Sequence, residues 1–335
     1  MIPSLVHLRE HAFVSGNLEG ELQLGTVSQD LIEAILGIHE PAEIRKAGRM
    51  LAANDDHKQL GETYLARAET LMTAARALGL EKEAMRGGLG TVAKIKVGPA
   101  FESFLLLLRG QCFPKLEQVD LTSCTTTGQR MESFSDAILK GRLASCTELN
   151  LRSNGINDAD MQSFSMAIAK TPLPRLFDLD LGDNKIGDIG LTAFATALHS
   201  KALPLLNDLE PRDESLVGDE GMKALASAIG SRPLGSCTVL NLSSNKIGDI
   251  GMKAFSNAIS SSGALRSLMA LSLNKNKIGD VGMEAFGNAI INGALESIRL
   301  IYVKDNTATT AAGNDKMREE IRKSRRIVFD IRSDL

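Results

Sequence analysis

Three carboxylates stand at the same point of successive short apolar segments and, by residue type, could perform acid and base catalysis. They are Asp120, Asp180 and Glu210. Such catalysis needs two groups close together whose pKa values differ. If the segments are neighbouring strands, Asn150 stands between Asp120 and Asp180 and separates them by roughly 10 Å. On an open surface we expect both to be hydrated, with pKa values near those of free carboxylic acids, so we predict no catalytic residue.

The histidines, cysteines and glycines suggest no other reactive arrangement. His7 and His11 have the i, i+4 spacing of a metal-binding pair on a helix, but no third ligand is near, and we expect no metal site. The four cysteines lack the Cys-x-x-Cys spacing and are expected to be reduced core thiols. No glycine motif typical of a phosphate-binding loop occurs. The sequence therefore predicts a protein that is not an enzyme and uses no cofactor.

The elements that position these residues come from an internal repeat of 30 or 31 residues. The phrase Asn-Lys-Ile-Gly-Asp-Ile-Gly begins at Asn184 and Asn245, and returns from Asn276 with Val for the second Ile. Each copy follows the apolar spacing L-x-x-L-x-L, with Cys237 as the first residue in one copy. The position that ends each apolar segment is held in turn by Cys124, Asn154, Asn184, Ser215, Asn245, Asn276 and Asn306. Seven repeats are therefore predicted, preceded by a capping helix over residues 99–110.

The spacing L-x-x-L-x-L predicts a short strand with one buried face. Leu179 and Leu181 point into the core, whereas Asp178 and Asp180 point to solvent, because side chains alternate along a strand. The Asn that follows offers both a donor and an acceptor to the backbone where the chain turns. The row of Asn residues is therefore predicted to be structural.

A helix is predicted after each Gly-Asp-x-Gly turn. In one repeat Met252, Phe255 and Ile259 fall at i, i+3 and i+7, which places them on one buried face. A glycine opens each of these helices, at a point where we expect a close backbone approach or an unusual dihedral angle. These glycines are Gly190, Gly221, Gly251 and Gly282.

This repeat length, with a full helix in each unit, resembles the ribonuclease-inhibitor-like class of leucine-rich repeats. That class includes ribonuclease inhibitor, the sensor domains of NOD-like receptors and the Ran GTPase-activating protein. The resemblance covers residues 116–306. It implies an α/β solenoid in the form of a horseshoe, with parallel strands on the concave face and helices on the convex face. It also implies a protein-binding role, but it does not specify the partner.

Two positions depart from the pattern. Pro211 stands where a core Leu is expected and Ser215 replaces the Asn, so we predict a short or bulged strand there, since proline cannot donate to a central ladder. Tyr302 places an aromatic ring on the exposed face of the last strand.

Four regions are predicted along the chain. Residues 1–86 form a small all-α domain, 87–115 a hinge and the capping helix, and 116–306 the repeat array. Residues 307–335 form a basic C-terminal helical cap and tail.

The formal net charge of −3, with both signs mixed throughout, favours neither nucleic acid nor an anionic membrane as a partner. Arg9, Glu10 and His11 interrupt the N-terminal segment where a signal peptide would be apolar. The longest apolar run, residues 104–108, is too short to cross a bilayer. We therefore expect a cytoplasmic or nuclear protein.

The exposed strand positions of the first four repeats are unusually acidic, which predicts a non-catalytic scaffold that binds a protein with a basic surface. One alternative is a GTPase activator like the Ran activator, although no arginine here matches a catalytic one. Another is a sensor fragment of an immune-type receptor, although no nucleotide-binding motif precedes the repeats. The predicted partner-binding residues are Asp120, Glu148, Asn150, Asp178, Asp180, Asp183, Asp208, Glu210, Asp213 and Tyr302.

Overall fold

The computed structural model describes residues 40–53, 58–212, 216–231, 234–262 and 264–306. They divide into two compact units. The first contains the described residues up to Gly90 together with Gly110–Cys112, and the second contains Thr91–Arg109 and the described residues from Phe113 onwards. Each unit is described by itself.

The first unit is helical, as predicted for this region. It contains α3 (Pro41–Ala52), α4 (Lys58–Ala77) and α5 (Glu81–Arg86), and the short 3-10 turn η2 (Leu89–Thr91) begins at its end. Along α4 one face is buried, with Tyr64, Ala68, Leu71 and Ala75 in the core. His7 and His11 lie outside the described residues.

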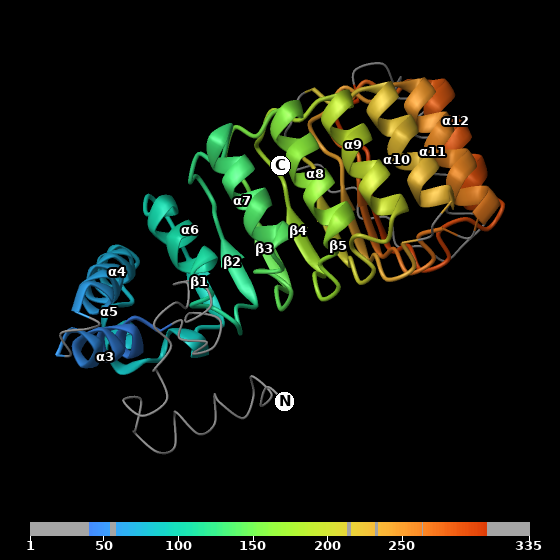
Figure 1. Ribbon diagram of the computed structural model, residues 1–335. Coiled ribbons are helices and arrows are strands. Elements are labelled where there is room, and N and C mark those ends of the chain that lie inside the picture. Colours follow the sequence, from blue (N-terminus) through green and yellow to red (C-terminus); the bar gives the residue numbers. More distant parts are fainter. Residues whose placement is uncertain (1–39, 54–57, 213–215, 232–233, 263, 307–335) are drawn as a thin grey trace, which may run out of the picture. The chain divides into compact units, whose positions relative to one another are not determined.

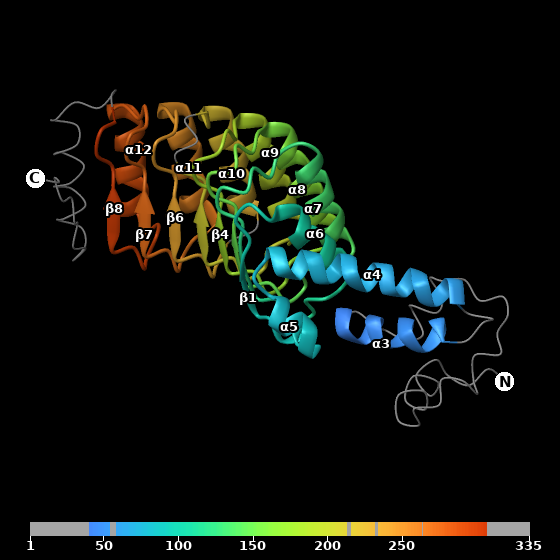
Figure 2. The ribbon, with the colours of Figure 1, turned by 90° about the vertical axis from the view of Figure 1, so that its left-hand side faces the viewer.

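The second unit is a parallel sheet covered by helices on one face (Figures 1 and 2). The eight strands that its described residues form follow one another in sequence order. The strands are β1 (Lys94–Lys96), β2 (Gln118–Asp120), β3 (Glu148–Asn150), β4 (Asp178–Asp180), β5 (Asp208–Glu210), β6 (Val239–Asn241), β7 (Ala270–Ser272) and β8 (Leu300–Tyr302). The helices are α6 (Phe101–Arg109), α7 (Gln129–Leu139), α8 (Asp158–Lys170), α9 (Asp188–His199), α10 (Asp219–Ser231), α11 (Asp249–Ser262) and α12 (Asp280–Ile291). This arrangement confirms the predicted α/β solenoid.

Strand β1 was not predicted. The segment 87–115 was expected to hold a hinge and a helix, and it does contain α6, but Lys94, Ile95 and Lys96 also pair in parallel with β2. Ile95 is the one residue of this strand that is buried. A single buried residue between two lysines is too little alternation to indicate a strand, which is why the sequence pattern did not reveal it.

The core of the second unit lies between the sheet and the helices. From β2 to β8, the middle residue of every strand is buried and its two neighbours are partly exposed. The helices contribute one large side chain each at equivalent positions, among them Phe134, Phe164, Phe194, Phe255 and Phe286, all fully buried. The four cysteines are buried, as predicted for core residues.

The Asn residues that end the strands bind the backbone of two repeats at once. The Nδ2 of Asn184 donates to the carbonyl oxygens of Leu151 and Leu181, at 3.1 and 2.6 Å. Its Oδ1 accepts from the N–H groups of Asn154 and Ile156, at 3.0 and 3.1 Å. The predicted structural role of this row is therefore confirmed for Asn184.

A second ladder, formed by aspartates, joins the helices. The Oδ1 of Asp188 accepts from the N–H groups of Gly218 and Gly221, at 2.7 and 2.9 Å, at the start of the next helix. Asp158, Asp219 and Asp249 make the same two bonds to the repeat that follows each of them. A carboxylate is stabilised at a helix N-terminus by the free N–H groups and the helix dipole. This explains why each turn reads Gly-Asp-x-Gly.

Strand β5 has three residues like its neighbours, so the strand before Pro211 is not shorter than the others, but its pairing with β6 is shortened. Strands β5 and β6 share two residue pairs, whereas β4 and β5 share three. In the preceding repeat the N–H of Leu181 donates to the carbonyl oxygen of Glu210, at 3.2 Å. Pro211 occupies the position equivalent to Leu181 and has no N–H to donate to the next strand. Ser215, the other departure, lies outside the described residues.

In the part of the chain that the structure describes, no helix combines the length and the apolar character that crossing a membrane requires. The predicted cap over residues 307–335 lies outside the described residues.

Candidate partner-binding face

The face of the sheet opposite the helices presents two rows of side chains. Strand register sets both rows, because the first and third residues of neighbouring strands are paired. The first row consists of Lys94, Gln118, Glu148, Asp178, Asp208, Val239, Ala270 and Leu300. The second row consists of Lys96, Asp120, Asn150, Asp180 and Glu210, and then, after the interruption at Pro211, Asn241, Ser272 and Tyr302.

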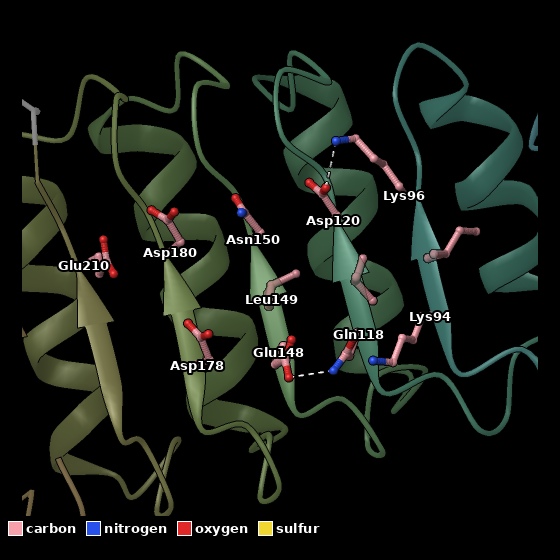
Figure 3. A pocket seen from close by; sticks show the side chains of 12 residues that line it. Lys94, Lys96, Gln118, Asp120, Glu148, Leu149, Asn150, Asp178, Asp180 and Glu210 are labelled. Carbon is pink, nitrogen blue, oxygen red and sulfur yellow. Dashed lines mark hydrogen bonds and ion pairs between the residues drawn. The ribbon is translucent and has the colours of Figure 1, made fainter. Parts of the chain in front are cut away.

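Five carboxylates gather on strands β3, β4 and β5, and we call them the acidic cluster. They are Glu148, Asp178, Asp180, Asp208 and Glu210. Figure 3 shows four of them projecting from the open face beside Asn150. A shallow hollow of about 460 Å³ extends over this face from β1 to β5, and all of the labelled carboxylates line it.

Two members of the acidic cluster have raised pKa values. Burial, followed by the charges of neighbouring carboxylates, raises the pKa of Asp178 to about 6. The same two causes raise the pKa of Asp208 to about 6. Partly buried, closely spaced acids on neighbouring strands therefore do not titrate like isolated groups on a flat surface.

Asp180 and Asp120, for which ordinary pKa values were expected, both depart from that expectation, and their pKa values shift in opposite directions. Burial raises the pKa of Asp180, and the charge of Glu210 raises it further. The pKa of Asp120 is lowered despite burial, because Thr122 donates hydrogen bonds to it and Lys96 lies 3.3 Å away. The register places Asn150 between them, as predicted.

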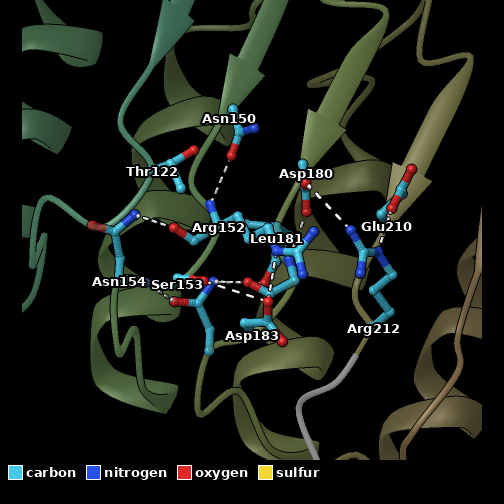
Figure 4. Close-up of polar contacts among 12 residues, drawn as sticks. Thr122, Asn150, Arg152, Ser153, Asn154, Asp180, Leu181, Asp183, Glu210 and Arg212 are labelled. Carbon is cyan, nitrogen blue, oxygen red and sulfur yellow. Dashed lines mark hydrogen bonds and ion pairs between the residues drawn. The ribbon is translucent and has the colours of Figure 1, made fainter. Parts of the chain in front are cut away.

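Two arginines neutralise part of the negative charge (Figure 4). Arg212 bonds Glu210 at 2.5 Å and lies 3.8 Å from Asp180. Arg152 pairs at 2.6 Å with Asp183, which stands in the turn after β4. Among the described residues, no Lys or Arg forms an ion pair with the other three members of the cluster, Glu148, Asp178 and Asp208. The negative charge therefore concentrates on the first row.

The structure brings together most, but not all, of the predicted binding residues. Asp120, Asn150 and the acidic cluster share the hollowed face. Asp183 lies beyond the end of its strand, and Asp213 lies outside the described residues. Tyr302 is separated from the cluster by β6 and β7 and lines a different hollow, of about 250 Å³.

Two residues on this face were missed by sequence reasoning. Lys94 and Lys96 both line the hollow at its β1 end. They were missed because β1 was not predicted, and the alternation Lys-Ile-Lys-Val was the available signal. In the described part of the chain, no group of three or more His, Cys, Asp and Glu side chains is arranged to hold a metal ion. What the face offers chemically is a set of anionic hydrogen-bond acceptors.

Comparison with known proteins bears on the repeat. The Leucine Rich repeat family matches residues 147–165, 177–195, 238–256 and 264–287. No curated protein matches the chain in sequence. One similar solved structure is the yeast Rad7–Elc1 complex, with 14% identity over 88% of this chain and 84% of that chain and a TM-score of 0.35. Another is the internalin InlF of Listeria monocytogenes, with 15% identity over 79% of this chain and 95% of that chain and a TM-score of 0.27.

Each family match begins shortly before a strand and ends inside the helix that follows, so each covers the strand, the turn and the first part of the helix of one repeat. The narrower ribonuclease-inhibitor-like class stays a prediction from the repeat length. The matched segments and the regular succession of parallel strands and helices identify the chain as a leucine-rich-repeat protein.

Proposed function

We propose that this chain is a non-catalytic binding protein whose acidic cluster receives a basic surface of a partner protein. The observation that carries the proposal is the alignment of Glu148, Asp178 and Asp208 in one row, with no ion-paired cation on any of the three within the described residues. Leucine-rich repeats present such extended strand faces to large partners.

Charge repulsion in the free protein supports a cationic partner. Neighbouring strands are about 4.8 Å apart, so the fields of adjacent carboxylates add over one surface. The pKa of about 6 for Asp178 and for Asp208, raised first by burial and then by neighbouring carboxylates, means that ionising both is already unfavourable before anything binds. A Lys or Arg placed between them removes that repulsion and gains charge-assisted hydrogen bonds.

The proposed contact has a centre and a margin. Its centre is Asp178 and Asp208, which are half-buried and carry no ion pair among the described residues. Asp180 and Glu210 share Arg212, so a partner there would compete with an existing cation. We place Asp120, Asn150 and Asp183 at the margin.

The proposal can be tested by selecting peptides from a random display library on the full chain. We expect the selected peptides to be enriched in Lys and Arg and to lose most of their binding to the double variant Asp178→Asn/Asp208→Asn. The matched control is Glu132→Gln/Glu284→Gln, which removes two exposed carboxylates from α7 and α12 on the helical side. Peptides without cationic enrichment, or equal loss on both double variants, would overturn the proposal.

A further inference from the structure

The first row of the open face changes from acidic to apolar residues between β5 and β6. Asp208 pairs in register with Val239, and the first row then continues through Ala270 and Leu300. These three apolar side chains are each partly exposed. Three apolar residues therefore follow three acidic residues in one straight row, and the border between them falls at the shortened pairing next to Pro211.

Two of these three apolar residues, Val239 and Ala270, line the second hollow. This hollow of about 250 Å³ is lined by residues of β6, β7 and β8 and of the turn after β7, and none of them is charged. The lining residues are Val239, Leu240, Asn241, Ala270, Ser272, Asn274 and Tyr302. Tyr302 stands at its far side, on the last strand of the sheet.

Three polar groups at the second hollow, Asn241 Oδ1, the Ser272 hydroxyl and Asn274 Oδ1, form hydrogen bonds within the protein. Asn241 Oδ1 accepts from the N–H and the hydroxyl of Ser243, at 3.2 and 2.8 Å. The hydroxyls of Ser243 and Ser272 are 2.6 Å apart, and Asn274 Oδ1 accepts from the N–H of Lys304 at 2.7 Å. Since these groups are hydrogen-bonded within the protein, the second hollow favours an apolar ligand group over a polar one.

We propose that the two parts of the face bind one segment of a partner protein, with cationic side chains over the acidic cluster and an apolar or aromatic side chain in the second hollow. This inference rests on the proposed function and specifies the chemistry of the partner. An amphiphilic protein segment fits both sides of the border. Charge complementarity favours cationic side chains over the acidic cluster, and burial of apolar surface favours an apolar side chain in the second hollow.

The strand spacing sets the distance between the two parts of such a segment. Asp208 on β5 and Ala270 on β7 are two strands apart, which corresponds to roughly 10 Å. A chain that crosses the strands in the polyproline II conformation covers this distance in about three residues, at about 3.1 Å each, and presents every third side chain on the same face. The partner segment should therefore carry a Lys or Arg and, about three residues away in either chain direction, a large apolar residue.

The peptides selected on the full chain give the test. We expect the cationic positions to recur with an apolar or aromatic position about three residues away. Binding of these peptides should fall about tenfold on Ala270→Gln/Tyr302→Ser, as the loss of one buried apolar side chain implies. The matched control is Val281→Gln/Ile250→Ser, which changes two exposed apolar residues at the starts of α12 and α11. It should leave binding unchanged.

A second measurement keeps the test independent of the stability of the variant. Replacing the apolar residue of the peptide by Gly should cost the same factor on the wild type and nothing further on Ala270→Gln/Tyr302→Ser. Cationic peptides that lack a recurrent apolar position, yet still need Asp178 and Asp208, would overturn this inference and leave the proposed function standing. Peptides that lack cationic residues would overturn both.

Discussion

The carboxylate of Asp188 accepts a hydrogen bond across the boundary between two repeats, from the backbone N–H of Gly221 at 2.9 Å. The approach is so close that a Cβ on Gly221 would lie 2.8 Å from the carboxylate oxygen. The glycine is therefore required by close contact and not by an unusual dihedral angle, which decides between the two reasons predicted from the sequence. The same relationship recurs at Gly190, Gly251 and Gly282.

Gly221→Ala should destabilise the array by about 1–3 kcal/mol, because the carboxylate must move and give up its bonds to the next helix. The matched control lies in the same helix: a Cβ on Gly230 would meet nothing nearer than 3.4 Å. Gly230→Ala should be neutral or slightly stabilising, since Ala favours a helix. Urea denaturation of the two variants compares them directly, and equal midpoints would contradict the capping role of Asp188.

Asn184→Leu should lower the free energy of unfolding by about 1–3 kcal/mol, because backbone groups of two repeats lose their buried partners. Asn245→Leu should cost less. The Oδ1 of Asn245 is buried and, among the described residues, has no hydrogen-bond partner, so fewer bonds are lost there. Thermal melting would rank the two variants. The reverse order, or wild-type melting for both, would show that the Asn row does not hold the turns.

The shortened pairing at Pro211 should be the weakest point of the ladder, because one donor to β6 is missing there. Backbone amides of residues 207–212 should exchange with deuterium faster than the matching amides of residues 177–182. Native-state hydrogen exchange followed by mass spectrometry measures both segments in one sample. Equal protection of the two segments would mean that side-chain packing compensates fully for the lost bond.

The sequence predicted the repeat well because each leucine-rich unit carries its own periodic signal. Leu179 and Leu181 could be assigned to the core and Asp178 and Asp180 to the open face from alternation alone, and the structure agrees. Strand β1 was not predicted because only one of its residues, Ile95, is buried. An edge strand is specified by its neighbour β2, which local sequence cannot reveal.

The alignment of the acidic residues on neighbouring strands was predictable, but their electrostatics were not. Register followed from the repeat length, so Asp178 and Asp208 could be placed side by side before the structure was known. Their burial could not, because it depends on how closely neighbouring strands and side chains surround each carboxylate. The role of Asp188 was also hidden, since its bonds are made to the following repeat and not within its own.

Neutralising the centre of the acidic cluster should stabilise the protein. The pKa of Asp178 and of Asp208 is about 6 in the fold, above its ordinary value of 3.8, so folding favours the protonated acids. The contribution of these two acids to stability should be greatest below about pH 4 and should be lost as the pH rises to about 6. At pH 7, Asp178→Asn/Asp208→Asn should gain roughly 1 kcal/mol per residue once solvent screening is allowed for. Melting temperatures from pH 4 to pH 8 would show this as a flatter profile. A profile parallel to that of the wild type would contradict it.

Binding to a basic partner should weaken with salt and with acid. Exposed charges are screened over a Debye length of about 8 Å at physiological ionic strength, so the association rate should fall as salt is added. A cation that settles between Asp178 and Asp208 lowers their pKa values, so binding releases protons and affinity should fall as the pH drops below about 6.

Charge reversal locates the surface responsible. Asp180→Lys/Glu210→Lys should weaken binding far more than Lys223→Glu/Lys253→Glu, which reverses two charges on the outer helices α10 and α11. Surface plasmon resonance with a selected cationic peptide gives the rates at several salt concentrations and pH values. The first double variant makes the net charge more positive and the second makes it more negative. An effect of net charge alone would therefore weaken binding of a cationic peptide in the first variant and strengthen it in the second, whereas a local contact is affected only in the first. Equal losses, or rates indifferent to salt, would place the contact elsewhere on the repeat array.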